Sequence, residues 1–128
     1  MRRIDLETWS RREHFEFLNA FDYPHWSMGA NVKMTAFYAA VKQRGASFNV
    51  ATVYLLARVA NSIREFRQRI RPGEVVEHEN VHPATTILGK DDLFGFCVFE
   101  YAEDFSVFAA EAAPRADCPG ASVPDAER

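Results

Sequence analysis

The chain has 128 residues, a formal net charge of −3, 48% apolar residues and 26% charged residues, the balance of an ordinary soluble globular domain. This length predicts a single domain. The slightly negative charge offers no basic surface for nucleic acid, and no apolar run approaches the roughly 20 residues that span a bilayer. The basic N-terminus, "MRRIDLETWS", is not followed by an apolar stretch, so we expect no export signal. Composition therefore predicts a cytoplasmic protein with no nucleic-acid and no membrane partner.

The N-terminal third predicts one helix and one strand. A helix is expected over residues 8–20, because Ser10 and Glu13 have the spacing of a capping box and Pro24 ends the helical pattern. Residues 26–35 then alternate apolar and polar side chains, which predicts a strand with one buried face. The apolar positions of this strand are Trp26, Met28, Ala30, Val32 and Met34.

Two helices are expected in the middle of the chain. Thr35 can cap a short helix that stops at Gly45. A longer helix over about residues 50–70 carries an apolar stripe that predicts a face turned to the core. The stripe consists of Leu55, Val59, Ile63, Phe66 and Ile70. A turn is predicted at Pro72 and Gly73.

The remainder predicts three extended runs, a helix and a tail. The extended runs are residues 74–79, 84–89 and 93–101, and the last has apolar residues on both faces, as in a central strand. Asp104 is expected to cap a final helix over residues 105–113. The next residues, 114–128, have three prolines, no aromatic residue and no periodicity. We therefore predict a disordered tail over residues 113–128.

His78 and His82, with Glu77 and Glu79 nearby, are the residues with the spacing closest to that of a metal site. On a helix the two imidazoles would share one face and could bind zinc. The preceding turn and Pro83 favour an extended segment, in which the two histidines stand about 13 Å apart at ~3.3 Å per residue. We therefore predict loop histidines with local hydrogen bonds and no metal site.

The two cysteines and the other two histidines also favour structural interpretations. Cys97 lies in an aromatic strand and is expected to be a small buried hydrophobe, because no base or cation is visible beside it to make it a nucleophile. Cys118 is expected to be an exposed thiol of the tail. His14 is expected to be structural and His25 to be a loop residue. No catalytic constellation is complete from these residues alone.

Three motifs nevertheless resemble the chloramphenicol acetyltransferases. They are Trp-x-Arg-Arg-Glu-His-Phe at residues 9–15, Glu-Phe-Arg at residues 65–67 and Val-His-Pro at residues 81–83. The resemblance runs from about Ile4 to about Ala112, so residues 1–112 are expected to be the N-terminal part of such a domain. It implies an incomplete α/β (α+β) two-layer sandwich with a mixed sheet, the fold of the CoA-dependent acyltransferases. It also implies a homotrimer with active sites between subunits.

In the family that these motifs resemble, an acetyl group moves from acetyl-CoA to a hydroxyl of chloramphenicol, which inactivates the antibiotic. A histidine of a His-His-x-x-x-Asp-Gly motif is the general base, and a serine stabilises the oxyanion. That motif is absent from these 128 residues. The resemblance therefore implies a truncated chain, without catalytic residues and inactive alone; a frameshift and a natural truncation are both open as its cause. The alternatives are a non-catalytic ligand-binding or complementing half-domain and an unstable translation product without function.

The resemblance also assigns residues to the site. Phe17, Leu18, Trp26 and Phe94 fall at positions of the acceptor-pocket wall, with Trp26 where the family usually has phenylalanine. Packing in the core is the alternative interpretation of these side chains. Arg11 falls where the family's arginine pairs with the aspartate of the catalytic motif and supports the active site. Because that aspartate is absent, Arg11 is expected to be solvated unless another carboxylate substitutes for it.

Overall fold

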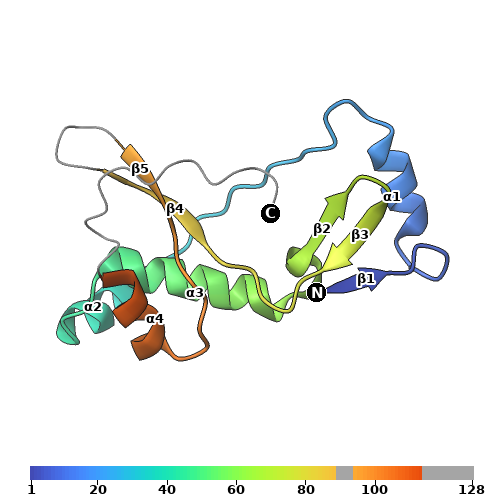
Figure 1. Cartoon of the computed structure of the whole chain (residues 1–128). Helices are drawn as coiled ribbons and strands as arrows, with labels where there is room; N and C mark the ends of the chain where they lie inside the picture. Colours follow the sequence, from blue (N-terminus) through green and yellow to red (C-terminus); the bar gives the residue numbers. More distant parts are fainter. Residues whose placement is uncertain (89–93, 114–128) are drawn as a thin grey trace.

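The computed structural model describes residues 1–88 and 94–113, and Figure 1 shows the arrangement of its elements. The predicted tail, Cys118 included, lies outside the described residues except for Ala113. The elements, in chain order, are β1 (Arg2–Ile4), α1 (Arg12–Asn19), α2 (Thr35–Gln43), α3 (Phe48–Ser62), the 3₁₀ helix η1 (Arg64–Arg67), β2 (Gln68–Arg71), β3 (Glu74–Glu77), β4 (Ala84–Leu88), β5 (Phe94–Val98) and α4 (Phe105–Ala112).

The molecule has two ends that α3 connects. One end holds α1 and a three-stranded sheet of order β1-β3-β2, and the other holds α2, α4 and the β4-β5 pair (Figure 1). This arrangement is α+β, as predicted. The described pairings are all antiparallel, so the mixed sheet implied by the resemblance is not present in this part of the chain. Two of the three pairs, β2-β3 and β4-β5, join successive strands, which pair antiparallel across a short connection.

The β2-β3 hairpin shows how the sequence produces this reversal. Arg71 pairs with Glu74, which leaves Pro72 and Gly73 as the two turn residues. Gly73 has φ 75°, a conformation that costs glycine little, so the predicted turn is confirmed. On β3, the neighbouring side chains Val75 and Val76 point to opposite faces, and each is only 1% exposed. β3 is therefore the central strand of its sheet, covered on both faces.

Helix α3 differs most from its prediction. It begins after Ser47, whose side chain accepts a hydrogen bond from the Val50 amide at 3.4 Å, and it ends where Ile63 adopts extended φ/ψ. The chain then forms η1 and β2 in place of the predicted continuation to residue 70. The buried side chains are Ala51, Tyr54 and Ala57. The predicted core-facing stripe is wrong for this chain: its five residues are 37–64% exposed.

The core of the second end is aromatic. Phe108 and Ala112 of α4 are completely buried and pack in one cluster with Tyr54, Cys97 and Phe99. The prediction that Cys97 is a buried hydrophobe is confirmed, since its side chain is only 3% exposed within this cluster. The predicted Asp104 cap is also confirmed. Its carboxylate accepts hydrogen bonds from the amides of Ser106 and Val107 at 2.7 and 3.2 Å.

The predicted strand over residues 26–35 is wrong. Residues 23–34 form neither helix nor strand, and Trp26, Met28 and Val32 are 72–80% exposed. Alternation makes a segment suitable for a sheet, but a strand forms only where a neighbouring strand accepts and donates its backbone hydrogen bonds. No described strand pairs with this segment. The alternation of apolar and polar residues is therefore not accompanied by a buried face among the described residues.

Two predicted helix caps are also wrong. α1 begins after Arg11, without a side-chain cap, in place of the Ser10–Glu13 box. Thr35 is the first residue of α2, and Met34 precedes it as the capping residue. Within the described residues, no helix is long and apolar enough to cross a membrane.

Candidate functional site

Helix α1 carries two of the five predicted site residues, Phe17 and Leu18, and a third, Arg11, directly precedes it. Charged side chains hold the start of this helix. Arg12 donates to Glu16 one turn further along the helix at 2.7 Å and pairs with Glu7 of the preceding loop at 3.1 Å. The hydrogen bond to Glu16, and then the charges of both carboxylates, raise the pKa of Arg12. These contacts orient α1 relative to the loop that enters it, and thereby orient Arg11, Phe17 and Leu18.

Arg11 has a carboxylate partner that sequence reasoning did not identify. Its Nη2 lies 3.0 Å from Oε1 of Glu65 on η1, with the two side chains 56% and 40% exposed. Arg11 is therefore exposed to solvent, and a carboxylate of this chain, Glu65, lies beside it. A pair this exposed contributes only about 0.2–1 kcal/mol. The sequence signal that could have pointed to Glu65 is the Glu-Phe-Arg motif, in which Glu65 is the first residue. The resemblance used this motif but assigned no role to its glutamate.

Glu65 belongs to a segment that a second carboxylate holds in place. Glu77 of β3 is only 11% exposed and meets the guanidinium groups of Arg2, Arg64 and Arg67 at 3.0, 2.8 and 3.4 Å. The hydrogen bond from Arg64 is the main cause that lowers the pKa of Glu77, against the opposing effect of burial. This ion cluster joins β1, β3 and η1, so it positions the element that carries Glu65.

The four predicted pocket-wall residues do not lie in the core. Phe17, Trp26 and Phe94 are 66%, 80% and 65% exposed and Leu18 is 46% exposed, so the core-packing alternative is wrong for this chain. They are also not brought together. Figure 1 places α1, which carries Phe17 and Leu18, and β5, which begins with Phe94, at opposite ends of the molecule.

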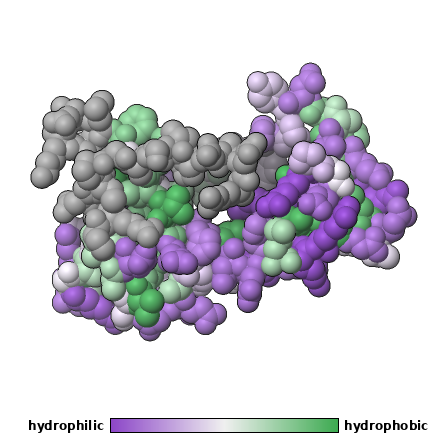
Figure 2. All heavy atoms as spheres, in the orientation of Figure 1, coloured by the Kyte–Doolittle hydropathy of each residue, from purple (hydrophilic) through white to green (hydrophobic). Residues whose placement is uncertain are grey.

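The aromatic rings instead form local pairs on separate surfaces. Phe17 contacts Phe21 with ring centroids 5.1 Å apart, and Phe94 contacts Phe96 at 5.7 Å. Figure 2 shows apolar side chains at the surface at both ends of the molecule. Each surface can bind a ring or an apolar chain, but the described residues do not combine the two surfaces into one pocket.

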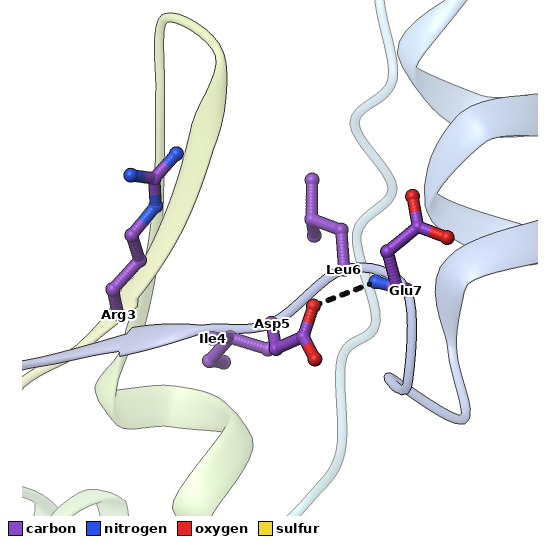
Figure 3. Close-up of a pocket in the computed structure, with 5 residues that line it drawn as sticks. All are labelled: Arg3, Ile4, Asp5, Leu6 and Glu7. Carbon is purple, nitrogen blue, oxygen red and sulfur yellow. Dashed lines mark hydrogen bonds between the residues drawn. The ribbon is translucent and has the colours of Figure 1, made fainter.

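A cavity of about 370 Å³ lies beside β1 and the loop toward α1, and it is lined by Arg3, Ile4, Asp5, Leu6 and Glu7 (Figure 3). The Asp5 carboxylate accepts hydrogen bonds from the Glu7 amide and the Thr8 hydroxyl, each at 3.0 Å. Figure 3 shows the first of these bonds closing the turn. None of the predicted wall residues lines this cavity, and its carboxylate is already used to shape the loop.

His78 and His82 lie in the connection from β3 to β4, not on a helix. Nδ1 of His82 accepts a hydrogen bond from the Tyr101 amide at 2.9 Å, so that nitrogen is not open to a metal. Burial, followed by the charges of Arg69 and Arg71, lowers the pKa of His78. The prediction of a loop histidine with a hydrogen bond is confirmed for His82, but the partner is 19 residues away and not local, as was predicted. In the part of the chain that the structure describes, no three histidine, cysteine or acidic side chains group as metal ligands.

Asn61 is a further structural residue that the sequence reading did not single out. Its side-chain amide donates to the carbonyl of Val81 at 2.9 Å, and its Oδ1 accepts from the amide of Val81 at 2.7 Å. The same side chain also donates to the Ala57 carbonyl within α3 at 3.0 Å. Asn61 therefore fixes the Val-His-Pro segment, one of the three family-like motifs, to α3.

Comparisons with known sequences agree on one family. A family model described as "Chloramphenicol acetyltransferase" matches residues 1–123. The chain is 32% identical over 106 residues to a chloramphenicol acetyltransferase from Klebsiella sp, which covers 82% of this chain and 48% of the relative. It is 34% identical over 113 residues to one from Streptomyces acrimycini, covering 87% and 51%. The chain spans about half the length of the curated relatives that it matches.

A solved structure titled "chloramphenicol acetyltransferase" has the same fold. It matches with a TM-score of 0.86 and 34% sequence identity, covering 96% of this chain and 59% of that chain. The predicted acyltransferase-like α+β fold is therefore confirmed. The family model continues beyond Ala112, where the resemblance was expected to end, and the boundary between residues 1–112 and 113–128 stays a prediction.

Proposed function

Because the chain belongs to the chloramphenicol acetyltransferase family, we propose that its residues form the acceptor-binding part of an enzyme that transfers an acetyl group from acetyl-CoA to a hydroxyl of chloramphenicol. Acetyl-CoA is the co-substrate of this proposal, and no residue of the described chain is assigned to hold it. The cytoplasm remains the predicted compartment.

The observation that supports the proposal most is the exposure of the aromatic side chains at the aligned wall positions. Phe17, Trp26 and Phe94 are each at least 65% exposed, although large aromatic rings are usually buried when they have no binding role. Ligand pockets are lined mainly by apolar and aromatic side chains, so rings left out of the core are available for this purpose. Trp26 is proposed to reshape the pocket where relatives have a phenylalanine.

We propose that the pocket closes between subunits of a homotrimer. A single chain presents Phe17 and Phe94 at opposite ends, so one copy cannot surround a ligand with both. Joining copies would place the α1 surface of one against a surface of the next, which also covers apolar area that one copy leaves exposed. The trimer is thus proposed as the state in which the wall residues act.

The general base is proposed to come from a His-His-x-x-x-Asp-Gly segment, which these 128 residues do not contain. In the proposed step, that histidine takes the proton of the chloramphenicol hydroxyl, and the hydroxyl oxygen attacks the thioester carbonyl of acetyl-CoA. A serine hydroxyl donates to the oxyanion, and the CoA thiolate leaves. Arg11 is proposed to exchange Glu65 for the motif aspartate and so to hold the base in position. The chain by itself is proposed to be inactive.

A chimera tests the proposal. Residues 1–112 of this chain are joined to the C-terminal half of the Streptomyces acrimycini relative, and chloramphenicol acetylation is followed by thiol release from acetyl-CoA. We expect turnover by the chimera and none by the 128-residue chain. Replacing the motif histidine in the chimera is the matched inactive control.

Substitutions within the chimera test the wall. Trp26→Ala is expected to raise KM for chloramphenicol by about tenfold, as when a buried apolar contact worth ~1.4 kcal/mol is lost, while Trp26→Phe retains most of the affinity. Tyr23→Ala, which removes a neighbouring 85% exposed ring with no assigned role, is the control and should leave KM unchanged. Turnover by the isolated chain, or a folded trimeric chimera without activity, would contradict the proposal.

A complementing half-domain is the second candidate. It is favoured by the exposed apolar side chains of α3 and of the segment after it, which offer a face to a separate polypeptide; these are Leu55, Leu56, Val59, Ile63, Phe66 and Ile70. Mixing the isolated chain with a separately expressed C-terminal half should then restore acetylation. Absence of any complex in sedimentation, with an active covalent chimera, would rule out this candidate and leave the first intact.

A further inference from the structure

A cavity between α2, α3 and α4 contains none of the predicted pocket-wall residues and not Arg11. Its volume is about 290 Å³, near the lower limit of small-molecule pockets. α2 contributes Phe37 and Val41, and α3 contributes Tyr54 and Leu55. Phe105 of α4 also lines the cavity. The lining is therefore almost entirely aromatic and aliphatic, suited to the apolar body of a ligand.

The cavity also carries two positive charges. Arg44 directly follows α2, three residues after Val41, and Arg58 lies on α3, three residues after Leu55. The second spacing places Arg58 on the same face of α3 as Leu55. Gly45, with φ 65°, turns the chain directly after α2 and so sets Arg44 at the edge of the cavity.

The two arginines differ from most others in the described chain. Six arginines pair with a carboxylate, and these are Arg2, Arg3, Arg11, Arg12, Arg64 and Arg67. Arg44 and Arg58 have no such ion pair among the described residues, and no described lining residue of the cavity is acidic. The cavity thus has a positive charge of two that the described protein does not neutralise, next to an apolar interior.

We propose that this cavity binds a small anionic amphiphile, a medium-chain carboxylate with its alkyl chain among the aromatic side chains and its carboxylate on Arg44 or Arg58. Guanidinium and carboxylate groups form bidentate hydrogen bonds, which fixes the polar end. The face of α3 from Ala51 to Arg58 is about 10 Å long at 1.5 Å per residue, sufficient for an alkyl chain. This site is separate from the proposed acceptor pocket and does not rest on that function.

The test is isothermal titration of the full chain with octanoate. Binding of one octanoate per chain is expected, and the double variant Arg44→Gln/Arg58→Gln is expected to weaken it by about tenfold through loss of a charge-assisted hydrogen bond. The control Arg71→Gln removes the same charge from β2, at the other end of the molecule, and should change nothing. Octylammonium, with the same chain and the opposite charge, should not bind measurably.

Three results would overturn the proposal. The first is no octanoate binding to the wild-type chain. The second is equal binding by wild type and the double variant, or equal binding of octylammonium, since either shows that the arginines do not select the ligand. The third is self-association that Ala46→Trp abolishes, because a second copy would then be the occupant of the cavity. Because Arg44 and Arg58 are both exposed, replacing them should preserve the fold, which circular dichroism checks.

Discussion

At the scale of single residues, a few polar side chains hold the elements together. Glu77 collects three guanidinium groups on one carboxylate, and Asn61 binds both backbone groups of Val81. Arg11, by contrast, makes one exposed pair with Glu65. The first two are placed to stabilise the chain itself, whereas Arg11 contributes little stability and remains available for another carboxylate.

Replacing Glu77 by glutamine should lower Tm by about 2–5 °C at pH 7, because Arg67 then keeps only carbonyl partners and its buried Nε already has none among the described residues. The pKa of Glu77 is lowered in the folded state, so its contribution is complete above the ordinary glutamate value of 4.5 and is lost as pH falls below it. Thermal melts from pH 7 to pH 3 should show the difference between wild type and variant shrink below pH 4.5. Glu74→Gln, which breaks one pair with the exposed Arg3, is the control with a smaller effect. A difference that grows toward low pH would contradict this account.

Replacing Asn61 by leucine should reduce the free energy of unfolding by about 1–3 kcal/mol, because the amide and carbonyl of Val81 lose their partners in a partly buried position. Urea denaturation followed by circular dichroism measures the change. Ser62→Ala provides the comparison: its exposed hydroxyl donates only to the Val59 carbonyl within the same helix, and its loss should be nearly neutral. Similar effects of the two replacements would show that the clamp on Val81 is unimportant.

At the scale of elements, α4 is defined both by a local cap at its start and by the packing of one face in the core. Asp104 satisfies two free amides at its start, and Phe108 and Ala112 bury one face completely. α3 shows the opposite case, since its small residues Ala51 and Ala57 are buried while Leu55 and Val59 of the predicted stripe remain exposed. The helix predicted over about residues 50–70 ends at Ser62, and the face predicted to be buried is wrong.

Replacing Asp104 by alanine should lower Tm by removing the cap, while Asp104→Asn should retain most of it, since an amide oxygen accepts the same hydrogen bonds. The Val107 amide is the main cause that lowers the pKa of Asp104 in the folded state. The advantage of wild type over the alanine variant is therefore present at neutral pH and declines as pH falls below the ordinary aspartate range. Melting curves of the three proteins at pH 7 and pH 3 measure this. Equal stability of the alanine and asparagine variants at pH 7 would show that the cap has no role.

At the scale of the whole molecule, incomplete burial is the dominant property. The exposed stripe of α3, the unpaired segment 23–34 and the aromatic surfaces of α1 and β5 all leave apolar area in water. Exposed patches of this kind mark surfaces that another polypeptide covers, or cause aggregation when they stay free. Each end of the molecule has its own buried core. We therefore expect each end to fold, while the exposed apolar surface causes the chain to self-associate.

The double variant Leu56→Ser/Val59→Ser tests this property. In the isolated chain, where these side chains are 65% and 49% exposed, the change should reduce self-association and binding of an apolar dye without lowering Tm appreciably. In the chimera, where the proposed C-terminal half covers this face, the same change should lower Tm by several degrees, roughly 4 °C or more. Sedimentation velocity and thermal melting provide both readings. Equal Tm losses in the two proteins would mean that the face is already packed within one chain.

The sequence by itself determined the elements whose signals are local. The glycine turns at Gly45 and Gly73, the Asp104 cap, the burial of Cys97 and the family motifs depend on neighbouring residues and backbone chemistry, so the sequence alone predicts them. Only the tertiary structure decided which faces are covered. An apolar pattern in Trp26–Met34 or along α3 states that a face prefers to be buried, but hydrogen bonds and packing partners far away in the chain decide whether it is. The same holds for Arg11, whose charge required a carboxylate that the fold supplies from Glu65, 54 positions away in the numbering of the chain.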